Sequence, residues 1–236
     1  MRVLIQQGSG ETGKRVSLDE NEAHHLRVRR AREREQVEVL DGAGLRATGR
    51  LARMGKQWAV DIETARQEPH PPQLSLAVAA GDRERFFWMV EKSVELGVTR
   101  IVPLVTAYSS TVATGIKTTH IPRLRRHALE SSKQCGAAWM LRLEDPLPLD
   151  DFLRRPLAGF GWLADRSGVS PPATLDSGAL SVVIGPEGGL TSGERDAALA
   201  AGYRPTVLGP YTLRFESAAI AAAALVTAAR MRGISG

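Results

Sequence analysis

Two segments rich in glycine and proline are the places where this chain could hold a small ligand. The first is Ile184-Gly-Pro-Glu-Gly-Gly-Leu-Thr191, and the second is Val207-Leu-Gly-Pro-Tyr-Thr-Leu-Arg-Phe-Glu-Ser217. Each follows a short apolar run and precedes a helical pattern, and Thr191 with Glu194 forms a capping-box pattern at the start of the first helix. Loops with so few side chains let the backbone and a helix N-terminus approach a flat or anionic ligand. We expect the two loops to build one pocket.

Charged residues in these loops are candidates for proton chemistry. Arg214 and Glu216 lie between a Gly-Pro turn and an apolar helix, opposite the first loop. A helix-start ion pair explains them equally well, because an acid is stabilised near the positive end of a helix. Glu187 could in the same way do no more than satisfy backbone N–H groups of its loop.

Other small-molecule signatures are missing from the sequence. The turn after the first strand of the second half, Ala80-Gly-Asp-Arg-Glu-Arg85, lacks the dinucleotide fingerprint, and no phosphate loop with its Gly-Lys-Ser/Thr ending occurs. The single cysteine, Cys135, excludes an internal disulfide framework and a multi-cysteine zinc site. His24 and His25 are adjacent and point apart in a helix, so we predict a structural role for them and no metal.

Basic residues favour a polyanionic partner. The chain has 236 residues, a formal charge of +5 and a pI of about 9.8. One basic run includes Arg27, Arg29 and Arg30, and a second, on a helix opened by Pro122, includes Arg123 and Arg126. Either run alone could be a solvated helix face. Two such runs in different domains favour a composite surface for a polyanion.

The periodicity of the chain divides it into two predicted domains. Residues 1–70 contain short alternating segments, typical of a small β-barrel, with one helix beginning near Asp19. The segment Glu68-Pro-His-Pro-Pro-Gln73 is a predicted linker, since prolines interrupt both helix and sheet. Residues 71–236 alternate strands and helices, which predicts a mostly parallel α/β sheet covered on both faces. The predicted strands are Leu74–Ala80, Arg100–Val105, Gly159–Ala164, Ser181–Ile184 and Pro205–Leu208; the predicted helices include Glu84–Leu96 and Pro122–Gln134.

The last predicted helix, Ser217–Arg232, is alanine-rich and apolar on most sides. A helix that is apolar nearly all round is buried, either within the monomer or against a second subunit, and we favour a homodimer. No run approaches the roughly 20 apolar residues of a membrane span, and the N-terminus lacks a signal-peptide core. With one cysteine, these features predict a cytoplasmic protein.

Taken together, these motifs resemble the ribosomal small-subunit methyltransferase E family, the 16S rRNA uridine-N3 methyltransferases of the SPOUT class. The resemblance rests on the two loops above, on Gly81-Asp-Arg-Glu-Arg with Glu91-Lys-Ser-Val-Glu-Leu-Gly-Val98, and on Gln134-Cys-Gly136. It implies a PUA-like, RNA-binding β-barrel over residues 1–70 and a SPOUT domain with a trefoil knot over residues 71–236. It also implies a homodimer and a bent S-adenosylmethionine as cofactor.

By this resemblance, residue roles can be assigned within the sequence. The implied cofactor pocket consists of Leu163, Ile184, Gly185, Pro186, Glu187, Gly188, Leu208, Gly209 and Leu213. We expect Glu216, or a water it holds, to accept the uridine N3 proton, and Arg214 to stabilise charge on the uracil oxygens. The arginines expected to contact RNA are Arg27, Arg29, Arg30, Arg123 and Arg126.

Three positions depart from the family pattern. Tyr108, Ala137 and Tyr211 stand where the family has arginines that face its substrate. Losing cations weakens phosphate contacts, while tyrosine rings offer base stacking instead. Two alternatives therefore stay open: an RNA-binding or ribosome-assembly protein, and a divergent methyltransferase with a different RNA target. A small-molecule methyltransferase is a third.

Overall fold

The computed structural model describes residues 1–79, 81–109 and 115–234, so Ala80, the last residue of the first predicted strand of the second domain, lies outside the described residues. The chain separates into two compact units. The first comprises Met1–Pro71 and Leu129–Met140, and the second comprises Pro72–Ala128 and Leu141–Gly236.

The first unit is built on a five-stranded sheet in the order β1-β3-β4-β5-β2. Only β1 and β3 pair in parallel; the other pairs are antiparallel. Gly49 sits where the β4–β5 register shifts, and a Cβ there would collide with the Asp61 carbonyl oxygen, so a larger residue would disrupt this bulge. The elements are β1 (Arg2–Leu4), β2 (Arg15–Ser17), α1 (Glu20–Val28), β3 (Gln36–Leu40), β4 (Leu45–Met54) and β5 (Gln57–Gln67).

Helix α1 confirms the predicted start near Asp19. The Asp19 carboxylate accepts a hydrogen bond from the Glu22 amide, the interaction that an N-cap residue supplies. The buried side of α1 includes Ala23 and Leu26, which join a core formed by Val39, Leu51 and other strand residues. This packing of one helix against the sheet gives the first unit its own hydrophobic core.

The end of α3 (Ile121–Cys135) belongs to the first unit, although the sequence-based division assigned all of residues 71–236 to the second domain. Two guanidinium groups satisfy carbonyl groups at this helix end. Arg2 donates to the Gln134 carbonyl at 2.5 Å, and Arg46 donates to the Gly136 carbonyl at 2.7 Å. Both arginines also bind Glu38. Such contacts between distant residues carry no local sequence signal.

A buried ion pair joins the same helix end to α1. Lys133 Nζ lies 2.7 and 2.8 Å from the two carboxylate oxygens of Glu22, and the two side chains are only 13% and 5% exposed. Burial raises the pKa of Glu22 and outweighs the opposing effect of Lys133. Lys133 Nζ also lies 3.2 Å from His25 Nδ1, which agrees with the structural role predicted for this histidine.

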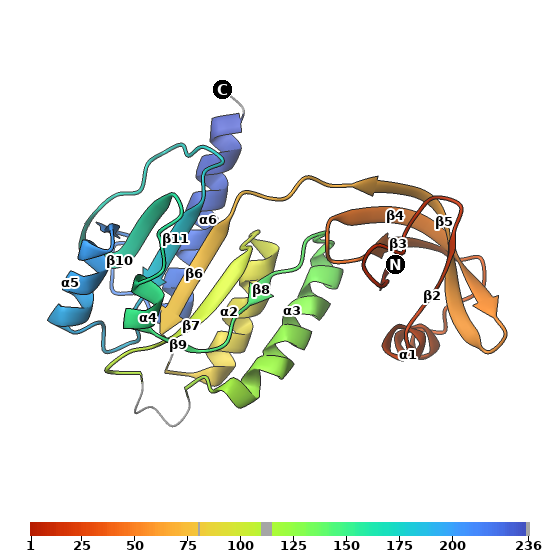
Figure 1. Cartoon of the computed structure of the whole chain (residues 1–236), viewed down its shortest axis with the longest axis horizontal. Coiled ribbons are helices and arrows are strands. Elements are labelled where there is room, and N and C mark those ends of the chain that lie inside the picture. Colours follow the sequence, from red (N-terminus) through yellow and green to blue (C-terminus); the bar gives the residue numbers. More distant parts are fainter. Residues whose placement is uncertain (80, 110–114, 235–236) are drawn as a thin grey trace. The chain divides into compact units, whose positions relative to one another are not determined.

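The second unit contains a seven-stranded parallel sheet in the order β12-β10-β11-β6-β7-β8, with β9 also paired to β7 (Figure 1). This confirms the predicted α/β architecture. Strand β6 is buried throughout. The strands are β6 (Leu74–Ala79), β7 (Arg100–Val105), β8 (Arg142–Leu143), β9 (Leu147–Pro148), β10 (Phe160–Val169), β11 (Leu180–Ile184) and β12 (Tyr203–Thr206).

Helices cover both faces of this sheet. On one face, α6 contacts β6, β11 and α2; on the other, α4 and α5 share a core with inward-facing strand residues such as Ala77 and Val183 (Figure 1). The helices are α2 (Arg83–Glu95), the first part of α3 with the preceding 3-10 helix η1 (Thr118–His120), α4 (Leu149–Leu153), α5 (Ser192–Ala200) and α6 (Phe215–Ile234). A fully parallel sheet requires this double cover.

Most predicted elements of the second unit are confirmed within a few residues, but the last strand differs. We predicted Pro205–Leu208, whereas β12 ends at Thr206 and Leu208 already lies in the second glycine loop. Gly97, Gly136 and Gly202, which follow the ends of α2, α3 and α5, all have positive φ, as is common for glycines that end helices. The short elements β2, β8, β9, α4 and η1 were not predicted, because two to five residues give no measurable periodicity.

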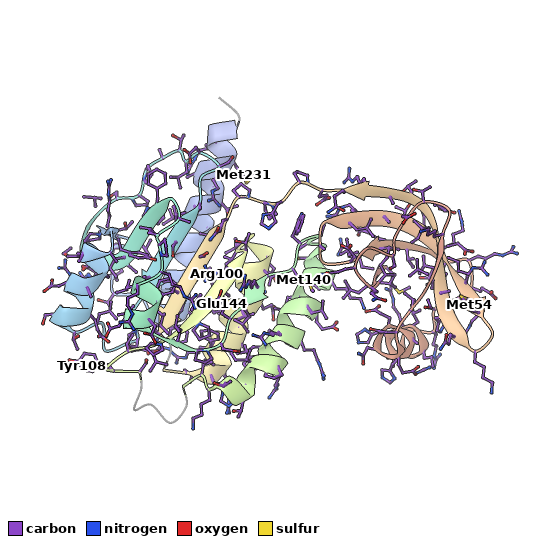
Figure 2. The ribbon with its side chains drawn as sticks, in the orientation of Figure 1. Met54, Arg100, Tyr108, Met140, Glu144 and Met231 are labelled. Carbon is purple, nitrogen blue, oxygen red and sulfur yellow. The ribbon has the colours of Figure 1, made fainter. Side chains whose placement is uncertain are left out.

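An ion-pair network ties β7 to the segment that follows β8. Arg100, the first residue of β7, lies 2.7 Å from Glu144, and Figure 2 shows the two side chains together. Arg155 lies 2.7 Å from the other oxygen of Glu144. Burial alone would raise the pKa of Glu144, but the hydrogen bonds and charges of Arg155 and Arg100 outweigh it and lower the pKa. These ion pairs hold the amino-terminal end of β7, opposite the carboxyl ends of the strands from which the glycine loops leave.

The buried pair in the first unit makes a stability prediction. Lys133→Met should destabilise the protein by about 3–5 kcal/mol, because it leaves the Glu22 carboxylate buried without its cation. The double variant Glu22→Leu with Lys133→Met should recover most of that loss, since an apolar pair has no charge to desolvate. Urea unfolding measures both. A loss below about 1 kcal/mol for Lys133→Met would contradict the buried-pair interpretation.

Candidate functional site

The two glycine loops line a single cavity of about 280 Å³ in the second unit. The first loop follows β11 and the second follows β12, so both leave the carboxyl ends of parallel strands. Ligands of open parallel sheets bind at this edge. The volume is close to the lower end of the about 300–1,000 Å³ typical of small-molecule pockets.

All but one of the residues predicted for the cofactor pocket line this cavity. They are Leu163, Ile184, Gly185, Pro186, Glu187, Leu208, Gly209 and Leu213. Gly188 is the exception, because its open side faces Tyr108: a Cβ at Gly188 would lie 3.3 Å from the Tyr108 Cβ. Tyr108 is 52% exposed, and Figure 2 labels it.

Two glycines keep the cavity open. A Cβ on Gly185 would lie 3.2 Å from Leu190 Cγ and 3.3 Å from the Gly189 carbonyl carbon. A Cβ on Gly209 would lie 3.3 Å from Leu213 Cδ1. Neither glycine has a positive φ, so their backbone conformation suits other residues and only the space is restrictive. A side chain at either position would therefore press on its neighbours in the loop by a few tenths of an ångström.

The first loop ends in the predicted capping box. Thr191 Oγ1 accepts from the Glu194 amide at 3.2 Å, and Glu194 Oε2 accepts from the Thr191 amide at 2.9 Å. The other oxygen of Glu194 accepts from the Ala107 amide at 2.8 Å. One carboxylate thus fixes the start of α5 and joins it to the loop that follows β7.

A charged network at the cavity was missed by the sequence analysis. Asp165 Oδ2 accepts from Arg195 Nε at 2.7 Å, and Asp165 Oδ1 accepts from the Ser167 amide and hydroxyl. Burial would raise the pKa of Asp165, but these hydrogen bonds and the Arg195 charge outweigh it and lower the pKa. The sequence does contain a signal for this network: Asp165 comes directly after Leu163-Ala164, on a buried strand that ends at this edge of the sheet.

Two further charges at the cavity have no salt-bridge partner within the described part of the chain. Arg166 donates to the Thr212 hydroxyl at 3.1 Å, and both residues line the cavity. Glu187, in the first loop, is exposed. The cavity therefore offers a cation and an anion in addition to the Asp165–Arg195 pair. A ligand with both positive and negative groups suits that arrangement.

The two predicted catalytic residues lie beside the cavity and do not line it, although their neighbours Leu213 and Phe215 do. Arg214 is exposed just before α6. Glu216 is buried in the first turn of α6, where one oxygen lies 3.5 Å from Arg85 Nη1. Its other oxygen is buried and has no hydrogen-bond partner among the described residues. The arrangement leaves one acceptor position on Glu216 open.

The predicted RNA-binding arginines are exposed in both units. Arg27, Arg29 and Arg30 lie at the end of α1 in the first unit, where Arg27 pairs with Glu20 at 2.5 Å. Arg123 and Arg126 lie on α3 in the second unit. Tyr211 lines the cavity and is 77% exposed, while Ala137 is half-buried in the first unit.

Neither a metal cluster nor a membrane helix occurs in the described ranges. No group of three or more histidine, cysteine, aspartate and glutamate side chains is placed to hold a metal ion there. None of the described helices has the length and apolarity needed to cross a bilayer. His24 and His25 belong to no such group.

Similarity to known proteins assigns this chain to a family. The family model described as "RNA methyltransferase domain" matches residues 68–227, and the model described as "RNA methyltransferase PUA domain" matches residues 18–58. Curated relatives share the name Ribosomal RNA small subunit methyltransferase E. The Synechocystis protein is 30% identical over 90% of this chain and 73% of its own length, and the Aquifex aeolicus protein is 27% identical over 88% and 92%. The chain belongs to the ribosomal RNA small subunit methyltransferase E family, as its motifs indicated.

Two solved structures of similar proteins contain the cofactor. A methyltransferase of Legionella pneumophila in complex with S-adenosylmethionine is 26% identical, covers 97% of both chains and superposes with a TM-score of 0.84. The Ribosomal RNA small subunit methyltransferase E of Neisseria gonorrhoeae, bound to S-adenosyl methionine, is 25% identical, covers 94% of both chains and gives a TM-score of 0.83. Both share nearly the whole fold with this chain.

The Asp165–Arg195 pair predicts a pH dependence of stability. Because folding lowers the pKa of Asp165, its contribution is complete above the unfolded value of about 3.9 and disappears as the pH falls through the lower folded value. Asp165→Asn should cost about 1 kcal/mol at pH 7, a modest figure because solvent screens the Arg195 end.

The measurement is urea unfolding of wild type and Asp165→Asn at pH 7 and near pH 3. The gap between them should shrink at the lower pH. The control Asp145→Asn breaks the exposed pair with Arg125 and should change little at either pH. A gap that stays constant or widens on acidification would show that Asp165 is not stabilised as a carboxylate.

Proposed function

We propose that this protein is an S-adenosylmethionine-dependent methyltransferase that methylates N3 of a uridine in 16S rRNA. The observation that supports it best is the convergence of both glycine loops on one cavity at the carboxyl edge of the sheet. The curated relatives carry the name of small-subunit rRNA methyltransferases, and the PUA-domain match covers residues 18–58.

The cavity suits S-adenosylmethionine by shape and by charge. Backbone groups of the two loops can face the adenine, because Gly185 and Gly209 leave no side chain in the way. The cofactor has an amino group, a carboxylate and a sulfonium, and the cavity presents Glu187, Arg166 and the Asp165–Arg195 pair. Leu163, Ile184, Pro186, Leu208 and Leu213 supply apolar contacts. Gly188, which does not line the cavity, would contribute by leaving room for the Tyr108 side chain that packs against it.

The protein's own chemical task is to manage a proton. Uridine N3 carries an imide proton and becomes a good nucleophile only when that proton leaves. When bound, S-adenosylmethionine supplies a methyl group already activated by its sulfonium. In this proposal the open oxygen of Glu216 accepts the proton, directly or through a water, while Arg85 holds the other oxygen. Arg214, exposed beside the cavity, stabilises negative charge on the uracil oxygens.

The RNA would be held by cations of both units. In this proposal Arg27, Arg29 and Arg30 of the first unit and Arg123 and Arg126 of the second contact phosphates, because all five are exposed. Tyr108 and Tyr211 would replace missing arginine contacts by stacking on bases. These replacements leave open a target uridine different from that of other family members.

A homodimer, a trefoil knot and a cytoplasmic location complete the proposal. Support for the dimer comes from the outward side of α6, where apolar residues recur at helical spacing and are only partly covered: Ala221, Ala224, Leu225, Ala228 and Met231. A second copy of α6 would bury this stripe. The knot would bring the two glycine loops together, and the cytoplasm is where ribosomal RNA and a single free thiol are both expected.

Filling the cavity should remove cofactor binding. Gly209→Val should weaken S-adenosylmethionine at least about tenfold in calorimetry, or about 1.4 kcal/mol, because its branched side chain takes the ligand's space. Gly193→Val is the matched control, since a Cβ at Gly193 meets nothing within 4 Å. Equal affinities for the two variants would place the cofactor elsewhere, and no binding by wild type would favour the non-catalytic RNA-binding alternative.

Removing the proposed base should separate chemistry from binding. Glu216→Gln should lower the methylation rate by about 10²–10⁴-fold, because the amide cannot accept the proton. Cofactor affinity should stay close to that of wild type, since Glu216 does not line the cavity. Single-turnover methylation and calorimetry measure the two quantities. Loss of rate and affinity to the same degree would assign Glu216 a structural role.

The reaction itself is tested by mapping modified nucleosides. Mass spectrometry of 16S rRNA from cells with and without the protein should show one 3-methyluridine that depends on it. Purified protein with labelled S-adenosylmethionine should restore it on free rRNA or on the small subunit. A different modified base would retain the methyltransferase and change its target.

A further inference from the structure

Four side chains that can donate hydrogen bonds gather where α2 and α3 begin. Arg83 is the first residue of α2, and Arg123 lies in the first turn of α3. Lys117 directly precedes η1, and His120 is the last residue of η1. Arg83 Nη1 lies 3.4 Å from His120 Nε2, and Arg83, Lys117 and Arg123 all act on the charge of His120. Among the described residues, none of these three cations has a carboxylate within 4 Å. We call these four residues the α2–α3 cluster.

The cations of the cluster lie at helix N-termini, where negative charge is preferred. Helix N-termini carry partial positive charge and favour acids, so arginine and lysine side chains there lower stability. The first turn of α3 contains no acid, and α2 has only Glu84 there. A set of cations kept at two helix starts is explained if an anion binds between them, because the helix ends then contribute as well.

The His120 ring shows where such an anion would sit. The Lys117 backbone amide donates to His120 Nδ1 at 3.1 Å, so in the neutral ring the proton is on Nε2. That N–H faces the guanidinium of Arg83, and the two donors lie 3.4 Å apart. Burial, together with the charges of Arg83, Lys117 and Arg123, lowers the pKa of His120. An anionic oxygen between them would accept from both donors.

The cluster lies on the same sheet edge as the cavity. Helix α2 follows β6 and α3 follows β7, and β6 pairs with β11, whose loop lines the cavity. Arg85, two residues after Arg83, pairs with Glu216 at the start of α6. Arg123 is steadied by the ring of Phe87, with its guanidinium carbon 5.1 Å from the ring centre. The first turns of α2 and α6, joined by the Arg85–Glu216 pair, therefore lie between the cluster and the cavity.

We propose that the α2–α3 cluster binds a phosphodiester of the RNA beside the nucleotide that enters the cavity. The proposal rests on the methyltransferase function above and adds Arg83, Lys117 and His120 to its RNA contacts. One non-bridging phosphate oxygen accepts from Arg83 and His120 Nε2, while Lys117 and Arg123 donate to the other. Phosphate is favoured over a carboxylate ligand because it offers several acceptor oxygens to donors on three segments.

The test is the salt dependence of RNA affinity, measured by fluorescence anisotropy on a single-stranded 16S rRNA fragment. Each phosphate that the protein neutralises contributes about 0.7 to the slope of log affinity against log salt on single strands. Because the cluster neutralises one phosphate, the triple variant Arg83→Gln, Lys117→Gln, Arg123→Gln should lower the slope by about 0.7, and each single variant should lower it by less. The matched control is Arg204→Gln, an exposed cation on the opposite edge strand β12, which should keep the wild-type slope.

Calorimetry with S-adenosylmethionine accompanies each variant, and its affinity should not change, which shows that the second unit is folded. A triple variant with the wild-type slope would overturn the proposal. So would a result in which uridine monophosphate or inorganic phosphate binds the cluster while the RNA slope is unaffected, since the ligand would then be a small phosphate. If the slopes change as expected but wild type transfers no methyl group, the RNA site stands and the methyltransferase function fails.

Discussion

The structure of the second unit depends on one constraint: the carboxyl ends of its parallel strands all meet at one edge of the sheet. Every loop that leaves β6, β7, β10, β11 or β12 must begin there. Residues from distant parts of the sequence, such as Leu163, Gly185 and Gly209, therefore line one cavity. The same constraint places the starts of α2, α5 and α6 around that edge, where their N-termini favour negative charge.

Pairs of opposite charges hold the loops and helix starts together at this edge of the sheet and leave the cavity open. Glu194 caps α5 and accepts from the Ala107 amide, Asp165 is neutralised by Arg195, and one oxygen of Glu216 faces Arg85. Each pair joins two loops or helix starts. The groups that stay without an opposite charge in the described residues, Arg166 and Glu187 at the cavity and the α2–α3 cluster beyond it, are those that a charged cofactor and an RNA phosphate can use.

The sequence predicted what local pattern controls and missed what distant contacts decide. The Thr191–Glu194 capping box, the glycine ends of the helices and nearly all longer strands follow from spacing and composition, and the structure confirms them. Most predicted pocket residues line the cavity because the two loop motifs are themselves the pocket. Asp165 and Arg195 escaped notice because 30 residues separate them. The packing of residues 129–140 with the first unit depends on Arg2, Arg46 and Glu22. These three residues lie far from Lys133 in the sequence, so the local pattern around Lys133 could not reveal the contacts.

Nuclear magnetic resonance of the backbone amides during titration with S-adenosylmethionine tests most directly whether the two glycine loops bind one ligand. If the two loops hold one ligand, the amide signals of Gly185 and Gly209 shift together and saturate at the same concentration, while Gly55, in the turn between β4 and β5, stays unchanged. Signals that move in only one loop, or that move only outside both, would contradict the account.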